Sequence, residues 1–396
     1  MKQIKSTGQW RRIWSFALII IGISLLFTLE LSAQEKKRSA RRDSVKTAKI
    51  EKGEGVLSFL GGPGYTPELK LLLAVGGLYS FKTNKEDSLI QRSTVNGSFG
   101  VTVPSGGIVS KLILTSFWNE DKMRINANFW FKNIPDHYWG VGYDEGLNTP
   151  KSDSTTAHNR LWWQVNPKFL FRVKKDFYIG PVLDFNQTNF TDESAGVLED
   201  PYYQKFGPKN FNAGLGAIIQ FDSRDIPVNA YRGTLIQATA SYYGSYLGGN
   251  NDYGMIDIDF RNYQQLGRTD GQTLALNLRG RFTTGDVPYG EMSQLGSPTD
   301  LRGYTWGRYR HESMIYGIAE YRHMFMNRKK NERSKHGAVV WVAAGTVMED
   351  VTEMDKLLPN FGIGYRFEVQ PRMNVRFDYG FGKDISGLYF NFTEAF

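Results

Sequence analysis

Polar and apolar residues alternate along most of this chain. In residues 372–379, Arg, Asn, Arg and Asp occupy every second position, and Met, Val, Phe and Tyr occupy the positions between them. Residues 211–224 show the same pattern, with Asn, Gly, Gln, Asp and Arg opposing Phe, Ala, Leu and Ile. A period of two is typical of β-strands whose two faces meet different surroundings. We therefore expect an all-β fold.

Fifteen segments carry this alternation: 68–82, 89–102, 107–118, 121–132, 158–172, 175–188, 209–222, 232–245, 252–264, 270–283, 312–326, 336–347, 359–369, 372–380 and 386–396. A soluble β-sandwich would alternate as well. Here the polar faces carry charges, Gly, Asn and Gln in many segments, and aromatic residues make up 14% of the chain. Both features favour a transmembrane antiparallel β-barrel with apolar residues towards lipid and polar residues towards a wet lumen. The barrel must close because lipid cannot satisfy a free strand edge.

The lengths of the connections predict the number of strands. Long connections fall at 133–157, 189–208, 284–311 and 348–358, whereas most tight turns fall in the other register. Bacterial barrels place long loops outside and short turns in the periplasm, and their strand number is even. One more strand is therefore expected within 53–62, which gives sixteen strands and places both termini in the periplasm.

The N-terminal region differs from the rest in composition. A basic start, an uncharged apolar run at 13–29 and small residues after it are typical of a secretory signal peptide, which we place at residues 1–33. A retained transmembrane helix is the alternative. Residues 34–52 are interpreted as a basic periplasmic linker and 53–396 as the barrel. The signal and linker hold 12 Lys/Arg and 4 Asp/Glu, which accounts for the net charge of +8. A neutral remainder argues against nucleic-acid binding.

Residues suited to covalent or metal chemistry are scarce. The chain has no Cys, which excludes disulfides, thiolate metal sites and a Cys nucleophile. Its five His residues do not have the spacing of metal ligands. The G-x-S-x-G motif of many hydrolases does not occur. We therefore expect no catalytic residue, no metal and no cofactor.

The last segment ends on aromatic residues. Leu388, Phe390, Phe392 and Phe396 are assigned to one face of an alternating strand that reaches the end of the chain. We interpret Phe390, Phe392 and Phe396 as a C-terminal sorting signal for barrel-assembly machinery. The alternative is an ordinary edge strand that ends in Phe.

Several motifs, in order along the chain, resemble those of one family. LRGY at 301–304 resembles the (V/I/L)-R-G-(F/Y) motif. The other matching stretches are 66–77 (first strands), 131–145 (P-x-x-(Y/F)-(Y/W)-G-(I/V)-G), 214–233 ((Y/F)-D-(S/T)-R-D), and 316–322 with 361–382 (closing strands). Together they resemble the bacterial surface antigen barrel of the outer-membrane assembly-factor and two-partner-secretion superfamily (BamA/TamA-like). The resemblance covers nearly all of 56–396.

This resemblance implies roles for particular residues. The loop that carries Arg302, Gly303 and Tyr304 is expected to fold into the lumen. There Arg302 would pair with Glu320 and Asp378, which alternation also places on lumen-facing positions. Asp222, Arg224 and Asp225 match the family's strand-and-turn motif, and we assign them a structural role rather than a catalytic one.

The resemblance also implies a function. We expect an outer-membrane protein of a Gram-negative bacterium that assists insertion, folding or translocation of outer-membrane proteins or lipids, and that is not an enzyme. Its expected partners are outer-membrane lipid, the barrel-assembly machinery that inserts it, and outer-membrane protein substrates. Family members that fold or secrete proteins carry periplasmic POTRA domains, and residues 34–55 are too short to hold one, so we expect a member without them.

Two alternatives remain at this stage: a passive pore or structural barrel, and a barrel hydrolase. Glycines 362, 364, 380, 382 and 387 fit a flexible seam between the first and last strands, although glycines also relieve crowding in any barrel.

Overall fold

The structure is a computed structural model that describes residues 44–66, 69–87, 90–267, 270–327, 332–350, 352, 354, 356–383 and 385–396. The predicted signal peptide, and the linker as far as residue 43, lie outside the described residues. The chain divides into two units, residues 1–56 and 57–396. In the first unit, residues 44–51 form a helix. None of the helices described is long and apolar enough to span a membrane.

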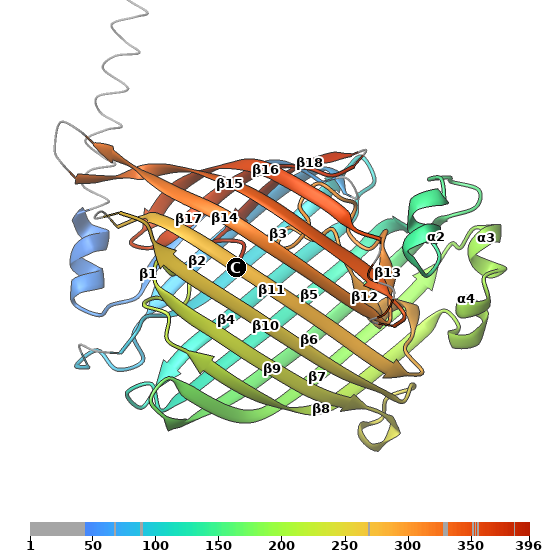
Figure 1. Ribbon diagram of the computed structural model, residues 1–396, viewed down its shortest axis with the longest axis horizontal. Helices are drawn as coiled ribbons and strands as arrows, with labels where there is room; N and C mark the ends of the chain where they lie inside the picture. Colours follow the sequence, from blue (N-terminus) through green and yellow to red (C-terminus); the bar gives the residue numbers. More distant parts are fainter. Residues whose placement is uncertain are drawn as a thin grey trace, which may run out of the picture. The chain divides into compact units, whose positions relative to one another are not determined.

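Sixteen strands of the described chain form one closed barrel (Figure 1). They are β1 (Val56–Thr66), β2 (Lys70–Phe81), β3 (Ser93–Val103), β4 (Ile108–Trp118), β5 (Met123–His137), β6 (Ala157–Lys174), β7 (Phe177–Thr191), β8 (Lys209–Asp222), β9 (Gly233–Tyr243), β10 (Tyr253–Gln265), β11 (Gln272–Gly285), β14 (Ser313–Asn327), β15 (Glu332–Met348), β16 (Leu358–Gln370), β17 (Met373–Phe381) and β18 (Ser386–Phe392). Neighbours in sequence are antiparallel neighbours in space, and β18 returns to pair with β1. The barrel, its strand number and the extra strand before residue 68 are thus confirmed.

The two faces of the wall differ as the alternation predicts. On β16, the outward residues Phe361 and Ile363 are 56% and 59% exposed, whereas the inward Asn360 and Arg366 are buried. An apolar outer face suits lipid, and the buried polar groups line the interior.

The connections at one end of the barrel carry the additional elements. They are α2 (Tyr143–Asn148), α3 (Ala195–Leu198), α4 (Pro201–Phe206) and the 3-10 turn η1 (Ser245–Leu247). Figure 1 shows α2, α3 and α4 gathered at this end. The longest connection, residues 286–312, is called the lumen loop below. It holds the 3-10 turn η2 (Tyr289–Glu291) and a small hairpin of β12 (Ser293–Gln294) and β13 (Arg310–His311).

One prediction about the last strand is wrong. β18 ends at Phe392 and does not continue to Phe396. Thr393 has a left-handed φ of 66°, which turns the chain out of the sheet. Phe396 therefore does not share the outward face of Leu388. It is buried, and its ring lies 6.3 Å from that of Tyr263, which also belongs to the buried core.

Candidate functional site: the lumen loop and the strand seam

A hydrogen-bonded turn positions Arg302 at the tip of the lumen loop. Asp300 Oδ1 accepts hydrogen bonds from the backbone N–H groups of Gly296 and Ser297, both at 2.8 Å. The Ser297 hydroxyl donates to the other carboxylate oxygen at 2.5 Å. Burial raises the pKa of Asp300, and these donors oppose that rise. The turn is therefore held from within, and Arg302 follows it at a fixed place.

Arg302 makes two buried ion pairs with the barrel wall. Its Nη2 lies 2.6 Å from Oε2 of Glu320 on β14, and its Nη1 lies 2.6 Å from Oδ2 of Asp378 on β17. All three side chains are 0% exposed. The guanidinium also stacks 3.6 Å from the ring centroid of Trp341. A planar guanidinium with two terminal nitrogens can bridge two carboxylates, which a lysine cannot do with the same geometry.

Further charges surround this contact and form a network that we call the charge cluster: Arg302, Glu320, Arg322, Arg366, Arg376, Asp378 and Glu394. Arg322 lies 2.8 Å from Glu320, and Arg366 and Arg376 lie 2.5 and 2.6 Å from Asp378. Glu394, beyond the end of β18, lies 2.7 Å from Arg366. The cluster thus joins the lumen loop, three barrel strands and the C-terminal segment.

The two residues after Arg302 pack against the same wall. Gly303 has a φ of 120°, and a side chain there would overlap the backbone of Gly380. Its N–H donates to the Tyr389 hydroxyl at 2.8 Å. The Tyr304 hydroxyl donates to the carbonyl oxygen of Pro359 at 2.7 Å. The motif that the sequence singled out therefore contacts β16, β17 and β18 along three successive residues.

The two other arginines of the lumen loop, Arg308 and Arg310, donate hydrogen bonds to backbone carbonyl groups. Arg310 Nη1 donates to the Tyr289 carbonyl at 2.8 Å, within the loop itself. Arg308 Nε donates to the Gly146 carbonyl on α2 at 2.6 Å. The first contact joins the two ends of the lumen loop, and the second joins the loop to α2. The helices α2, α3 and α4 together are called the helical cap below.

The strand-and-turn residues lie at the opposite end of the strands from that cap. Asp222 Oδ2 lies 2.6 Å from Nη1 of Arg124 on β5, and Oδ1 lies 2.8 Å from Nε of Arg224. Asp225 accepts from backbone N–H groups of the following turn and lies 2.6 Å from Arg372. These contacts join β5, the β8–β9 turn and the β16–β17 turn. In the described residues, no group of His, Asp or Glu side chains is arranged to hold a metal ion.

The C-terminal aromatics occupy three different places. Phe390 lies beside Phe377 on the wall, with the two rings tilted by 48° and their centroids 5.1 Å apart. Phe392 is buried with Leu78 and Val375, and a side chain on Gly76 of β2 would overlap its ring. Phe396 lies inside the lumen below Arg322. Their role as a sorting signal stays a prediction.

β18 lies between β17 and β1 and closes the barrel. β17 pairs with β18 along a continuous run from Val375–Phe392 to Phe381–Ser386. For the described residues, the pairing of β1 with β18 is registered at Tyr65–Leu388. The junction of β1 and β18, where the first and last strands meet, is called the seam below.

The position of Glu291 in η2 makes the docking of the lumen loop sensitive to pH. Trp162 Nε1 donates to its carboxylate at 3.4 Å. Burial, followed by the negative charge of Asp184, raises the pKa of Glu291 from 4.5 to about 8, although Arg281 opposes the rise. In the docked loop, the Glu291 carboxyl keeps its proton up to about pH 8, whereas in an undocked loop it loses that proton above its ordinary pKa of 4.5. Docking of the lumen loop is therefore strongest below pH 4.5 and weakens as the pH rises from 4.5 towards 8.

We expect protease cleavage of the lumen loop to be faster at pH 9 than at pH 5, and Glu291→Gln to reduce this difference. The protease's own pH profile is corrected for with an unfolded substrate. Equal pH dependence in the wild type and Glu291→Gln would contradict the assignment.

Sequence reasoning missed several members of this site. Trp341, Arg366 and Glu394 were not predicted to lie near Arg302, although alternation along β16 places Arg366 inside. Glu394 carried no signal, because it was assigned to a strand that ends before it.

Known proteins resemble this chain in both sequence and structure. A family model described as the Omp85 superfamily domain matches residues 93–396. The structure of BamA from Haemophilus ducreyi lacking POTRA domains 1-3 is similar, with 13% identity and a TM-score of 0.54, over 86% of this chain and 69% of that chain. CdiB from Acinetobacter baumannii has 12% sequence identity and a TM-score of 0.54, and the match covers 86% of this chain and 59% of that chain. CdiB from Escherichia coli has 10% sequence identity and a TM-score of 0.53, and the match covers 86% of this chain and 62% of that chain.

The chain thus spans less than two thirds of either CdiB chain. No curated protein matches the sequence significantly. At these identities, the structural likeness shows the fold alone.

Proposed function

Because the chain belongs to the Omp85 superfamily, we propose that it assists the insertion, folding or translocation of outer-membrane proteins or lipids in a Gram-negative bacterium. The proposed action is mechanical. The wall opens at one seam, and the lumen loop keeps the remaining barrel in shape. Both termini would lie in the periplasm.

The observation that carries this proposal is the docking of the lumen loop on strands next to the seam. Arg302 contacts β14 and β17, and Gly303 donates to Tyr389 on β18, the strand that closes the barrel against β1. An edge with unpaired N–H and C=O groups can template an incoming strand.

The charge cluster supports the same proposal. Arg302 anchors the loop on β14 and β17, and Gly303 rests on β17 and β18. These strands lie on one side of the seam. The loop therefore braces the C-terminal side of the barrel, so that opening the seam need not unfold the adjoining strands.

Deleting the gene tests this function. We expect a set of outer-membrane proteins to fall in abundance, measured by quantitative proteomics of isolated outer membranes, and to recover when the wild-type chain is supplied. If the proteome does not change while uptake of small solutes shifts, the chain is a pore and the proposal is wrong.

A further inference from the structure

The residues after β18, residues 393–396, form a segment that we call the tail. Thr393 turns the tail out of the sheet through its left-handed φ of 66°. Glu394, Ala395 and Phe396 are each 7% exposed, although none of them belongs to a strand. The tail therefore lies in the lumen as a short peptide held by the wall, and not as part of the wall itself.

Side chains of two strands hold the carboxylate of Glu394. Its Oε2 lies 2.7 Å from Nε of Arg366 on β16, and its Oε1 accepts a hydrogen bond from Nδ2 of Asn374 on β17 at 2.7 Å. Arg366 also pairs with Asp378 at 2.5 Å. Because the wall holds Arg366 in this way without help from the tail, we expect the carboxylate site to persist when the tail leaves it.

The ring of Phe396 has a place of its own beside this carboxylate site. It lies against Tyr263 on β10, and the guanidinium carbon of Arg322 on β14 lies 5.0 Å from its centroid. Arg322 Nη2 also donates to the main-chain oxygen of Phe396 at 3.1 Å. A guanidinium over an aromatic ring attracts it, so the wall favours an aromatic residue two positions after an acidic one.

The wall keeps unused hydrogen-bonding groups at this place. Nη1 of Arg322 and Oδ1 of Asn374 are buried, and neither has a hydrogen-bond partner among the described residues. A buried polar group without a partner is unfavourable, so the tail satisfies its surroundings only in part. A peptide that reaches these atoms can therefore compete with the tail.

This part of the lumen lies near the end of the barrel opposite the helical cap. Asn374 is the second residue of β17, and Tyr263 lies two residues before the end of β10. The proposed function places this end in the periplasm, where substrates arrive. A peptide that enters from that side reaches the tail without passing the helical cap.

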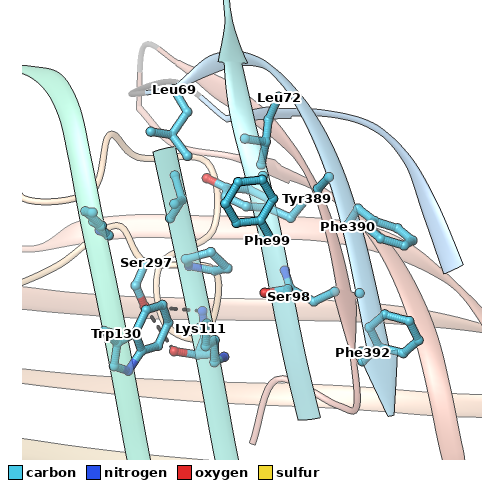
Figure 2. Close-up of a pocket in the computed structure, with 18 of the residues that line it drawn as sticks. Leu69, Leu72, Ser98, Phe99, Lys111, Trp130, Ser297, Tyr389, Phe390 and Phe392 are labelled. Carbon is cyan, nitrogen blue, oxygen red and sulfur yellow. Dashed lines mark hydrogen bonds between the residues drawn. The ribbon is translucent and has the colours of Figure 1, made fainter. Parts of the chain in front are cut away.

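A cavity beside β18 leads to the start of the tail (Figure 2). It lies between β18, the lumen loop and strands β2–β5, and Figure 2 shows Phe390 and Phe392 on one side of it, away from Trp130. Its lining includes Asn391 and Phe392, which directly precede the tail. A second segment can therefore place side chains beside β18 while its own end reaches the place of the tail.

We propose that the wall holds a peptide-binding site, called the tail site, which the tail occupies as an internal competitor. The tail site is formed by Tyr263, Arg322, Arg366 and Asn374. It accepts an acidic residue followed two positions later by an aromatic residue. Its ligand is the last segment of an outer-membrane protein substrate, since Phe396 belongs to the predicted sorting signal that such substrates would share. The inference rests on the proposed function for the source of the peptide only, because binding is measured without assembly.

Binding of a labelled peptide to the full chain in detergent, measured by fluorescence anisotropy, tests the tail site. The first peptide has the sequence of residues 386–396, and the second differs only in carrying Gln in place of the Glu. We expect the wild type to bind the first peptide weakly, because the tail occupies the site. The Glu394→Gln/Phe396→Ala variant holds its own tail less firmly and should bind the first peptide roughly tenfold more tightly. The second peptide has the same apolar residues and should bind either chain weakly.

Tyr263→Ala and its matched control Tyr243→Ala, each added to that variant, locate the binding. Both tyrosines are buried, but Tyr243 ends β9 at the opposite end of the barrel. Tyr263→Ala should lower the affinity to the wild-type level, whereas Tyr243→Ala should leave the gain intact. If the double variant does not fold, as judged by its mobility on semi-native gels, Phe396→Ala alone takes its place, because it keeps the contacts of Glu394.

Each other outcome overturns the proposal. One is a tail variant that binds the first peptide no more tightly than the wild type does. Others are equal binding of the two peptides, and equal losses with Tyr263→Ala and Tyr243→Ala. These results leave the proteomic test untouched, so the proposed function can stand while the tail site falls. An unchanged proteome together with tight peptide binding would instead remove the substrate and leave the site.

Discussion

Arg302→Ala is expected to release the lumen loop from the wall. The substitution leaves Glu320 and Asp378 buried with fewer cations, although Arg322, Arg366 and Arg376 stay beside them. Removing one partner of a buried ion pair typically costs about 3–5 kcal/mol. The remaining arginines place the expected loss near the lower end of that range. The stacking of the guanidinium on Trp341 is lost as well.

Two measurements report this release. The temperature at which the barrel loses its compact form on semi-native gels should fall, and protease should cut the lumen loop at a lower concentration. Arg302→Lys keeps one positive charge but cannot bridge both carboxylates, so its effect should lie between those of the wild type and Arg302→Ala.

Arg308→Ala provides the control for the loss of an arginine from the same loop. Arg308 donates to backbone carbonyls at α2 rather than to buried carboxylates. Its removal leaves no unpaired charge, and the expected destabilisation is about 1 kcal/mol. Equal effects of Arg302→Ala and Arg308→Ala would show that the charge cluster does not hold the loop.

Alternation made most of the barrel predictable, because a strand between lipid and a wet lumen must change polarity at every residue. The prediction failed where that constraint ends. Residues 393–396 alternate with β18 in sequence, but Thr393 turns them inward, and Phe396 meets Arg322 and Tyr263. The hairpin of β12 and β13 was missed because each of its strands has only two residues, too few to show alternation.

Around Arg302, alternation placed Glu320 and Asp378 inside, and the family resemblance paired them with Arg302. The charge cluster as a whole could not be predicted. Whether Arg366 on β16 reaches Asp378 depends on the register between β16 and β17, which pairs Gly364 with Asp378. Cross-strand register follows from packing around the whole barrel, and a local pattern does not contain it.

For two glycines of the closing strands, the structure favours the relief of crowding over a flexible seam. A side chain on Gly362 would overlap the indole of Trp341, and one on Gly380 would overlap the Arg302 backbone. These glycines therefore give room to Arg302 and to the ring beneath it. They permit close approach of the loop rather than flexibility of the seam.

A disulfide across the seam is expected to abolish assembly activity. Tyr65 and Leu388 are Cα partners on β1 and β18, and facing residues of antiparallel strands are close enough for a disulfide. The chain has no Cys, so Tyr65→Cys/Leu388→Cys introduces the only pair. Oxidation should prevent opening, and the outer-membrane proteome of cells that carry this variant should resemble that of the deletion.

The comparison that isolates the seam uses a pair on the same side of the barrel. Ile363 and Tyr379 are Cα partners on β16 and β17 and, like Leu388, are exposed on the outer face. Ile363→Cys/Tyr379→Cys should leave the proteome unchanged when oxidised, because these strands need not separate. A reductant should restore activity to the seam variant alone. Normal activity with a fully oxidised seam would mean that substrates do not pass through this junction, and the mechanical proposal would have to be given up.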